Sequence, residues 1–359
     1  MSTSSHYPRS VQITVHLDAV AHNYQTLQQL SGGKTFAVVK ADAYGHGIDA
    51  VASYLSTIAD GFAVVTVGEG VAVRDAGATQ PVLVMQGPQD EEDVDTLFQH
   101  GLWPVLHDEA QIELVQRHRN AIDIEVWLEV ETGMGRLGIS LESAVTHLQN
   151  DQLRWQGVMS HLASADDTDN PMTANQVSQL IELKNRFNLP FSLANSAGVL
   201  AWPATHLDWS RVGIGLYGSH PVLMNQDPES LLRTTMSVQA PIVSVKSLPA
   251  GQTIGYGETY RCPEPMSVAY AAVGYGDGLP RVLDDSARVL IHGVQCPIIG
   301  RVSMDSIAID CRPLQVLPTL GELITLWGPE LKVEQWAAAA GTISYELFTG
   351  IRGRRKYTD

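Results

Sequence analysis

Between residues 35 and 215 the chain alternates short apolar runs with amphipathic or polar segments, and this alternation constrains the fold more than any other feature. The apolar runs predict strands at residues 36–39, 61–65, 81–85, 104–106, 124–130, 157–160, 191–194 and 211–214. The segments between them, such as residues 69–76, 91–100, 109–118, 141–150 and 174–187, are predicted helices or polar connections. Strands separated by helices over about 200 residues favour an α/β architecture, a (β/α)₈ barrel of the TIM type rather than an open sheet.

The pattern changes after Tyr217. From Met236 onward, strand-like runs follow one another without long helices, at residues 237–245, 267–273, 287–292, 295–299, 307–311 and 322–327. Proline and glycine separate these runs, as in a mostly antiparallel β domain. We therefore predict a barrel domain over residues 1–230 and a C-terminal β domain over residues 231–359, with a polar loop at 220–232. Whether the first residues cross to the β domain stays open. Residues 334–340 are a candidate short helix, and residues 352–356 a candidate basic tail.

Composition narrows the classes of partner. The chain has 359 residues, above the usual size of a single core, so two domains are expected. Its formal net charge of −16 argues against nucleic acid or an anionic membrane as partner. We find no apolar run of membrane-spanning length and no signal-peptide pattern at the N-terminus. Three cysteines without paired spacing indicate neither a disulfide framework nor a metal site, so we expect a cytoplasmic protein without a bound metal.

The segment Val39-Lys-Ala-Asp-Ala-Tyr-Gly-His-Gly47 follows the first predicted barrel strand. A lysine at the carboxyl end of a buried strand is partly desolvated, which disfavours its charged form. Such an amine suits Schiff-base chemistry. Considered alone, Lys40 could equally well be a lysine that extends its ammonium group from a strand end to solvent. The tyrosine and the glycines that crowd after it favour a functional site.

Other polar residues lie at or near the ends of later predicted barrel strands, and the active sites of such barrels collect at the carboxyl ends of the strands. They are Glu129, Arg136, His161, Asn195, Ser196 and Arg211, together with the Gly213-Ile214 pair. Each has an ordinary structural explanation, such as helix capping for Asn195-Ser196 or an ion pair for Arg211. Their common placement at one face of the predicted barrel makes coincidence improbable and suits a bound anionic cofactor.

These motifs resemble those of the alanine racemases. The lysine segment is similar to the pyridoxal-phosphate motif of that family, and Glu131-Thr-Gly-Met-Gly-Arg-Leu-Gly138 resembles its Asp-Thr-Gly-Met-x-Arg-Leu-Gly. The resemblance continues through Ser160-His-Leu-Ala163, Ala194-Asn-Ser-Ala197, Gly255-Tyr-Gly257, Gly274-Tyr-Gly-Asp-Gly278, Gly300-Arg-Val-Ser-Met-Asp305 and Ser344-Tyr-Glu346. Ordered motifs across almost the whole chain are far more specific than any single one.

The resemblance implies a role for each matching residue. Lys40 is expected to carry pyridoxal 5′-phosphate as a Schiff base, and Tyr256 to be the second base in the interconversion of L- and D-alanine. The phosphate is expected to lie among Tyr44, Ser196, Gly213, Ile214 and Tyr345, with Arg211 at the pyridine nitrogen and His161 beside the ring. Asn195 is also expected among the cofactor-binding residues. Arg136 and the Met304 backbone are expected to bind the substrate carboxylate, with Tyr275, Asp305 and Glu129 in support. The family works as a homodimer in which the tyrosine of one subunit reaches the lysine of the other.

The chain departs from the family pattern at Glu129. Many alanine racemases carry at this position a lysine that carbon dioxide converts to a carbamate, whose negative head fixes an arginine. A glutamate already bears a carboxylate, so it is expected to orient Arg136 without modification. Its stem is shorter, and a water or an anion is an alternative to direct contact. The other interpretation is an ordinary surface-directed glutamate.

Three other functions remain open at the level of sequence. A racemase of the same fold that acts on serine, lysine or arginine would have a relaxed entrance, whereas this chain keeps Tyr275 and Tyr345. A pyridoxal-phosphate-binding protein without racemase activity would lack Tyr256 and the β domain. A decarboxylase of the related two-domain type would need a cysteine near the substrate, and Cys262, Cys296 and Cys311 stand in no motif of that kind.

Overall fold

The computed structural model of the chain describes residues 9–150, 152–221 and 231–359. It divides into two compact units, one of residues 19–233 and the other of residues 1–18 together with 234–359. The predicted polar loop at 220–232 lies largely outside the described residues.

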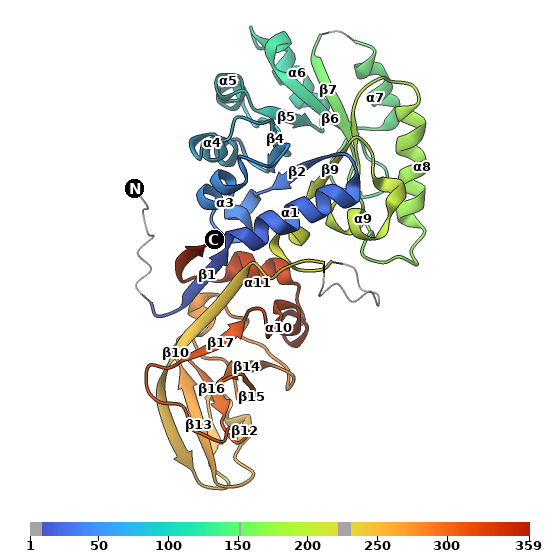
Figure 1. Cartoon of the computed structure of the whole chain (residues 1–359). Helices are drawn as coiled ribbons and strands as arrows, with labels where there is room; N and C mark the ends of the chain where they lie inside the picture. The colour runs from blue at the N-terminus through green and yellow to red at the C-terminus, as the bar shows by residue number, and fades with distance from the viewer. Residues whose placement is uncertain (1–8, 151, 222–230) are drawn as a thin grey trace. The chain divides into compact units, whose positions relative to one another are not determined.

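The first unit is a closed barrel of eight parallel strands, as predicted (Figure 1). The strands are β2 (Lys34–Val38), β3 (Gly61–Val64), β4 (Val82–Val84), β5 (Trp103–Leu106), β6 (Glu125–Glu129), β7 (Arg154–Met159), β8 (Phe191–Ser192) and β9 (Trp209–Val212). Each pairs in parallel with its successor, and β9 pairs with β2 to close the ring. All eight lie within or beside the predicted runs, because strands buried on both faces read as continuous apolar sequence.

Helices cover the barrel. They are α1 (Leu17–Ser31), α3 (Ile48–Leu55), α4 (Val67–Asp75), α5 (Glu91–His100), α6 (Glu109–Gln116), α7 (Leu141–Leu148), α8 (Met172–Lys184) and α9 (Ser196–Ala201). Polar side chains cap several of them, for example Asp90 at α5 and Ser140 at α7. A core of apolar residues, including Leu128, Val158 and Phe191, fills the space between strands and helices.

The barrel interior is packed with aromatic rings. Phe36 stacks on Trp209 with ring centroids 4.0 Å apart, and Trp127 meets Phe36 edge-on at 5.8 Å. Gly157 faces this cluster, and a Cβ at that position would overlap the Trp127 ring. The interior is therefore a packed core, and only the ends of the barrel are available for a site.

The second unit is built on one mixed sheet with the strand order β13-β16-β15-β14-β17-β10-β1-β18. Its strands are β1 (Gln12–His16), β10 (Met236–Leu248), β13 (Met266–Ala271), β14 (Arg288–Ile291), β15 (Val294–Ile299), β16 (Ile307–Asp310), β17 (Leu323–Trp327) and β18 (Arg354–Thr358). The long strand β10 pairs with β17 through its first half and with β13 through its second half. The pairings are antiparallel except for that of β1 with β18, so the predicted fold class is confirmed.

Three elements of this unit differ from the sequence-based expectation. The predicted basic tail is wrong, because residues 354–358 form strand β18 alongside β1. The helix predicted at 334–340 is present as α10 (Val333–Ala340), but it is followed by a second helix, α11 (Ser344–Gly350), that we did not predict. A small hairpin of β11 (Thr253–Ile254) and β12 (Tyr260–Arg261) was also missed.

Candidate active site

Lys40 opens a turn with a rare backbone conformation. The next four residues, Ala41, Asp42, Ala43 and Tyr44, all have φ between 51° and 55°. A left-handed turn of non-glycine residues costs about 1–2 kcal/mol per residue. Strain of this kind persists only where surrounding contacts impose it, and it clusters at functional sites. The segment α2 (Lys40–Tyr44) is therefore a strained support for the lysine, placed just beyond the carboxyl end of β2.

Glu69 holds this turn from the neighbouring helix α4. Its Oε1 accepts the Ala41 N–H at 2.7 Å, and its Oε2 accepts the N–H groups of Val65 and Thr66 at 2.9 and 3.1 Å. The Thr66 side chain in turn accepts the Glu69 N–H, which completes a capping box. The Thr-x-x-Glu pattern in the sequence could have revealed the cap, but not the bond to the residue after Lys40.

Aromatic rings pack against the turn that follows Lys40. Tyr217 stacks on Tyr44 with centroids 4.7 Å apart and on His46 at 4.5 Å, and its hydroxyl donates to the Val38 carbonyl at 3.0 Å. A Cβ at Gly213 would overlap the Tyr44 hydroxyl. Only glycine at position 213 therefore leaves room for this tyrosine.

Ser196 and the Gly213–Gly215 segment form a small polar cradle beside Tyr44. The Ser196 Oγ accepts the N–H groups of Gly213 and Gly215 at 3.0 and 3.1 Å. The Ile214 N–H between them has no acceptor among the described residues. Asn195 lies next to the cradle, and its Oδ1 caps α9 through the Gly198 N–H at 2.9 Å, so the capping interpretation of this residue is realised.

Arg211 is buried at the same end of the barrel. Its guanidinium donates to the Ser192 Oγ at 2.6 Å and to the Ser160 carbonyl at 2.7 Å. Burial lowers the pKa of Arg211 to about 10, while Glu129 acts in the opposite direction. Its Nε–H has no acceptor among the described residues, so this N–H of a buried cation is open to a ligand.

Lys40 and His161 share the electrostatic field of these cations. Burial lowers the pKa of Lys40, and Arg136 and Arg211 lower it further, whereas Glu69 raises it. Burial, followed by the charges of Arg211, Arg136 and Lys40, lowers the pKa of His161 to about 3. The histidine is therefore neutral at physiological pH, and a larger share of the lysine is in its nucleophilic form.

Glu129 ends strand β6 and is only 4% exposed, so the surface-directed interpretation is wrong. Burial raises its pKa, whereas Arg211, His107 and Arg136 lower it. No direct hydrogen bond joins Glu129 to Arg136 within the part of the chain that the structure describes. Arg136 itself is exposed, and its N–H donates to Glu131 at 3.3 Å.

Glu131 organises the loop that carries Arg136. One of its carboxylate oxygens accepts the Gly135 N–H at 2.7 Å, and the other accepts the N–H of Gly133. Partial burial raises the pKa of Glu131, but these backbone donors outweigh burial and hold it below its usual value. The sequence places Glu131 only within a motif and gives no sign that it anchors the loop.

The remaining predicted residues belong to the second unit. Tyr256 lies in the loop of the β11–β12 hairpin between two glycines with positive φ, Gly255 and Gly257, and is 70% exposed. A Cβ at Gly257 would meet the Arg301 guanidinium. The loop therefore packs against residue 301 and directs a largely uncovered phenol to the surface.

Tyr275 and Met304 lie on two adjacent turns. The Tyr275 N–H donates to the Ser303 carbonyl at 3.1 Å, and the Gly276 N–H donates to the Met304 carbonyl at 2.9 Å. Both side chains are exposed, as is that of Tyr345 at the start of α11. Asp305 follows Met304 and pairs with Arg9, a residue that the sequence analysis missed.

The predicted site residues thus fall into two groups by unit. The barrel unit brings ten of them to the carboxyl ends of its strands: Lys40, Tyr44, Glu129, Arg136, His161, Asn195, Ser196, Arg211, Gly213 and Ile214. The second unit carries the other five: Tyr256, Tyr275, Met304, Asp305 and Tyr345.

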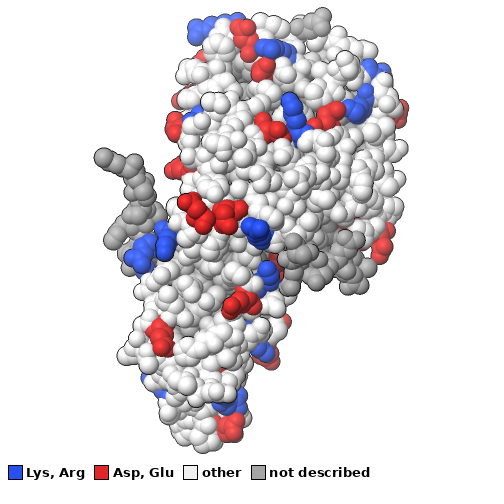
Figure 2. Space-filling model, in the orientation of Figure 1, with Lys and Arg blue, Asp and Glu red and all other residues white. Residues whose placement is uncertain are grey.

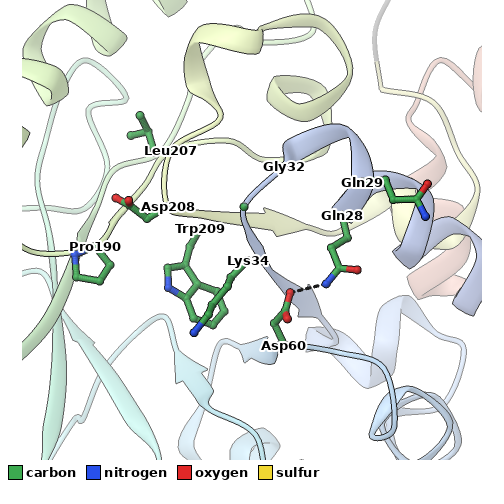
Figure 3. A pocket seen from close by; sticks show the side chains of 10 residues that line it. Gln28, Gln29, Gly32, Lys34, Asp60, Pro190, Leu207, Asp208 and Trp209 are labelled. Atoms are coloured by element: carbon green, nitrogen blue, oxygen red, sulfur yellow. Dashed lines mark hydrogen bonds between the residues drawn. The ribbon is translucent and has the colours of Figure 1, made fainter.

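A cavity of about 810 Å³ lies at the opposite end of the barrel (Figure 3). Lys34, Asp60 and Trp209, which line it, stand at or just before the amino ends of β2, β3 and β9. Asp60 there accepts hydrogen bonds from Gln28 and from the Thr35 N–H. Since catalytic groups of such barrels collect at the carboxyl ends, this cavity is separate from the candidate site.

Along residues 9–150, 152–221 and 231–359, no helix is both long and apolar enough to cross a bilayer, and no three His, Cys, Asp or Glu side chains gather as a metal site. On the face shown in Figure 2, acidic and basic side chains are interspersed and do not gather by sign.

Known proteins resemble the chain along nearly its whole length. The models of the alanine racemase N-terminal and C-terminal domains match residues 15–221 and 235–358. Alanine racemases from Azoarcus sp. (strain BH72) and Pseudomonas taetrolens are 37% and 36% identical to it, each over 96% of this chain and 98% and 97% of the relative.

Solved structures agree with the sequence matches. The biosynthetic alanine racemase from Pseudomonas aeruginosa superposes with a TM-score of 0.93 at 34% identity, covering 98% of this chain and all of the other. An alanine racemase from Bartonella henselae with covalently bound pyridoxal phosphate superposes with a TM-score of 0.89 at 28% identity, with the same coverage. The chain belongs to the alanine racemase family of pyridoxal-phosphate-dependent enzymes.

Proposed function

We propose that this chain interconverts L-alanine and D-alanine with pyridoxal 5′-phosphate held at Lys40. The observation that carries the proposal is the polar group at the carboxyl end of the barrel, where a desolvated lysine, a buried arginine and an open backbone N–H occur together. D-alanine made in this way would serve peptidoglycan synthesis, or the reverse reaction would degrade it.

The residues of the barrel fit the cofactor. Hydroxyls of Tyr44 and Ser196 and the N–H of Ile214 lie beside the Gly213 backbone, where no side chain covers them, and such groups suit a phosphate. The free Nε–H of Arg211 suits the pyridine nitrogen. A guanidinium keeps its protons, so Arg211 would leave the pyridine nitrogen unprotonated. The ring would then withdraw electrons less strongly, and the side reactions that a protonated ring promotes would be limited.

The proposed mechanism uses two bases on opposite faces of the substrate Cα. When bound, the cofactor withdraws electrons from the Cα–H bond and so acidifies it. Lys40 Nζ would remove or return the proton on one face, and the Tyr256 hydroxyl would do so on the other. The lowered pKa of Lys40 supports this role, since a base must be partly unprotonated near working pH.

Substrate binding is assigned to Arg136, Met304 and their supports. The exposed Arg136 guanidinium and the Met304 N–H would hold the alanine carboxylate. Glu129 would orient Arg136 by charge, through a bridging water or anion, because no direct hydrogen bond joins the two side chains among the described residues. Tyr275 and Tyr345 would narrow the entrance and favour alanine over larger amino acids.

We further propose a homodimer in which Tyr256 acts at the lysine of the partner subunit. Its 70% exposure within its own unit supports this arrangement, because a catalytic phenol needs a covering surface to exclude water. The three free, buried cysteines are consistent with a reducing compartment, and we propose the cytoplasm.

The test starts with the purified protein and added pyridoxal phosphate. A near-visible absorbance band that survives dialysis, followed by D-alanine formation from L-alanine, is expected for the wild type and not for Lys40→Ala. Serine, lysine and arginine assayed in parallel measure substrate breadth. A stable band without turnover of any amino acid would support a cofactor-binding protein and overturn the racemase proposal.

A further inference from the structure

Arg9 joins two turns of the second unit that the proposed function places at the substrate. Its Nε and Nη2 donate to the Asp277 carboxylate at 2.5 and 3.1 Å, and Nη2 also pairs with Asp305 at 2.7 Å. Asp277 belongs to the turn of Tyr275, and Asp305 directly follows Met304. We propose that Arg9 is a positioning residue that fixes the Met304 N–H for the substrate carboxylate, an inference that rests on the proposed function.

The Tyr275 turn is a rigid platform for this contact. The Asp277 side chain is completely buried and accepts the Gly274 N–H at 2.9 Å, while its carbonyl accepts the Arg352 N–H at 2.7 Å. A Cβ at Gly274 would overlap the backbone of residues 303 and 304. One end of the Arg9 bridge is therefore anchored in the core.

The Met304 turn has fewer restraints. The Ser303 N–H closes it onto the Ser306 carbonyl at 3.0 Å, and the Met304 carbonyl accepts the Gly276 N–H. The Met304 N–H has no acceptor among the described residues, so it is open to an anion. The Asp305 side chain is 65% exposed, and Arg9 is its ion-pair partner. Arg9 thus links the turn that carries the open Met304 N–H to the buried Asp277 of the Tyr275 turn.

The consequence is specific to substrate binding. A carboxylate held by Met304 does not react, so its contact is as strong in the ground state as in the transition state. Loss of such uniform binding raises KM and leaves kcat unchanged. Asp277 and Asp305 both raise the pKa of Arg9, so the bridge stays charged throughout the working range.

Arg312 provides a matched control in the same unit. Like Arg9, it bridges a buried aspartate and an exposed carboxylate, pairing with Asp310 at 2.6 Å and with Glu264 at 2.8 Å. The side chains have similar exposed fractions. They are 35%, 0% and 65% for Arg9, Asp277 and Asp305. They are 37%, 5% and 61% for Arg312, Asp310 and Glu264. Arg312→Gln therefore removes an equivalent bridge without touching the Met304 turn.

The experiment compares cofactor-loaded Arg9→Gln and Arg312→Gln with the wild type. For Arg9→Gln, KM for both alanine enantiomers is expected to rise about three- to tenfold, with kcat within about twofold. Hydrogen exchange at residues 303–306 should quicken in this variant only. Arg9→Lys keeps the charge but loses the planar guanidinium, so its KM should lie between those of the wild type and Arg9→Gln.

An unchanged KM with unchanged exchange in Arg9→Gln would overturn the inference, as would an equal rise of KM in Arg312→Gln. If Arg9→Gln does not fold, Asp305→Asn breaks only the exposed arm of the bridge and must show the same rise of KM. A wild type that binds cofactor but does not racemise alanine would refute the proposed function instead, and the exchange measurement would still test the bridge.

Discussion

At the scale of single residues, burial and charge at the barrel mouth decide protonation states. Glu129, where the sequence departs from the pattern of the resemblance, is buried, and the charges of Arg211, His107 and Arg136 act on it. Burial raises its pKa while the cations lower it, so the charge of this one carboxyl depends on its neighbours. No direct hydrogen bond joins it to Arg136 among the described residues, so the proposed orientation of Arg136 would rest on charge.

We expect Glu129→Gln to raise KM by about three- to tenfold, because the glutamine removes the charge that orients Arg136. Activity of the wild type should not depend on bicarbonate, since no lysine at this position needs carbon dioxide. Both are measured by steady-state kinetics with and without added bicarbonate. Kinetics identical to the wild type in Glu129→Gln would leave the glutamate without a part in orienting the arginine.

The pH dependence of stability is expected to reveal His161. Its pKa is about 3 in the folded chain against an ordinary value of 6.5. Between these values the unfolded chain binds a proton that the folded chain does not, so the free energy of unfolding falls as pH drops below 6.5. Thermal unfolding of wild type and His161→Gln between pH 8 and 5 tests this, and the variant should lose less stability. Parallel curves would contradict it.

At the scale of elements, the left-handed turn after Lys40 depends on helix α4. The two carboxylate oxygens of Glu69 accept three backbone N–H groups, those of Ala41, Val65 and Thr66. The same helix therefore ties together the chain after β2 and the chain after β3. A helix cap here also orients the residue proposed to hold the cofactor.

We expect Glu69→Gln to lower the free energy of unfolding by about 1–3 kcal/mol, because its amide NH₂ would oppose at least one backbone N–H. It should also release bound pyridoxal phosphate faster on dialysis, followed by the loss of near-visible absorbance. Asp93→Asn is the control, since Asp93 likewise accepts a backbone N–H, that of Gln89 at 2.8 Å, but at helix α5. Equal cofactor loss in both variants would argue against a specific role for Glu69.

At the scale of the whole molecule, the proposed catalytic groups belong to different units. Lys40 belongs to residues 19–233 and Tyr256 to residues 234–359. If each active site takes its tyrosine from the partner subunit, a dimer contains two sites built from both chains. Such an arrangement permits complementation between differently damaged subunits.

Mixing inactive Lys40→Ala with inactive Tyr256→Ala subunits is expected to restore activity. Each mixed dimer would contain one site with both residues intact, and one with neither. Subunit exchange is verified by tagging the two variants differently and purifying the doubly tagged dimer before the assay. Verified mixed dimers without activity would refute the shared site, whereas mixing two Lys40→Ala preparations should yield none in either case.

Local sequence patterns determined most of the fold. Apolar runs of strand length between amphipathic segments required buried parallel strands with helical connections, and all eight barrel strands follow from that pattern. Polar residues at or near the ends of those runs had to meet at one end of the barrel, as Lys40, Glu129 and Arg211 do. These features depend on periodicity and burial, which a linear sequence records directly.

Contacts between distant segments could be decided only by the tertiary structure. Strand β18 was mistaken for a basic tail because an edge strand with exposed side chains lacks the alternating pattern of a half-buried one. The Arg9–Asp277 pair spans 268 positions, and the bond from Ala41 to Glu69 spans 28. No periodicity encodes such pairs, because they exist only once the chain has closed around its core and brought unrelated turns within hydrogen-bonding distance.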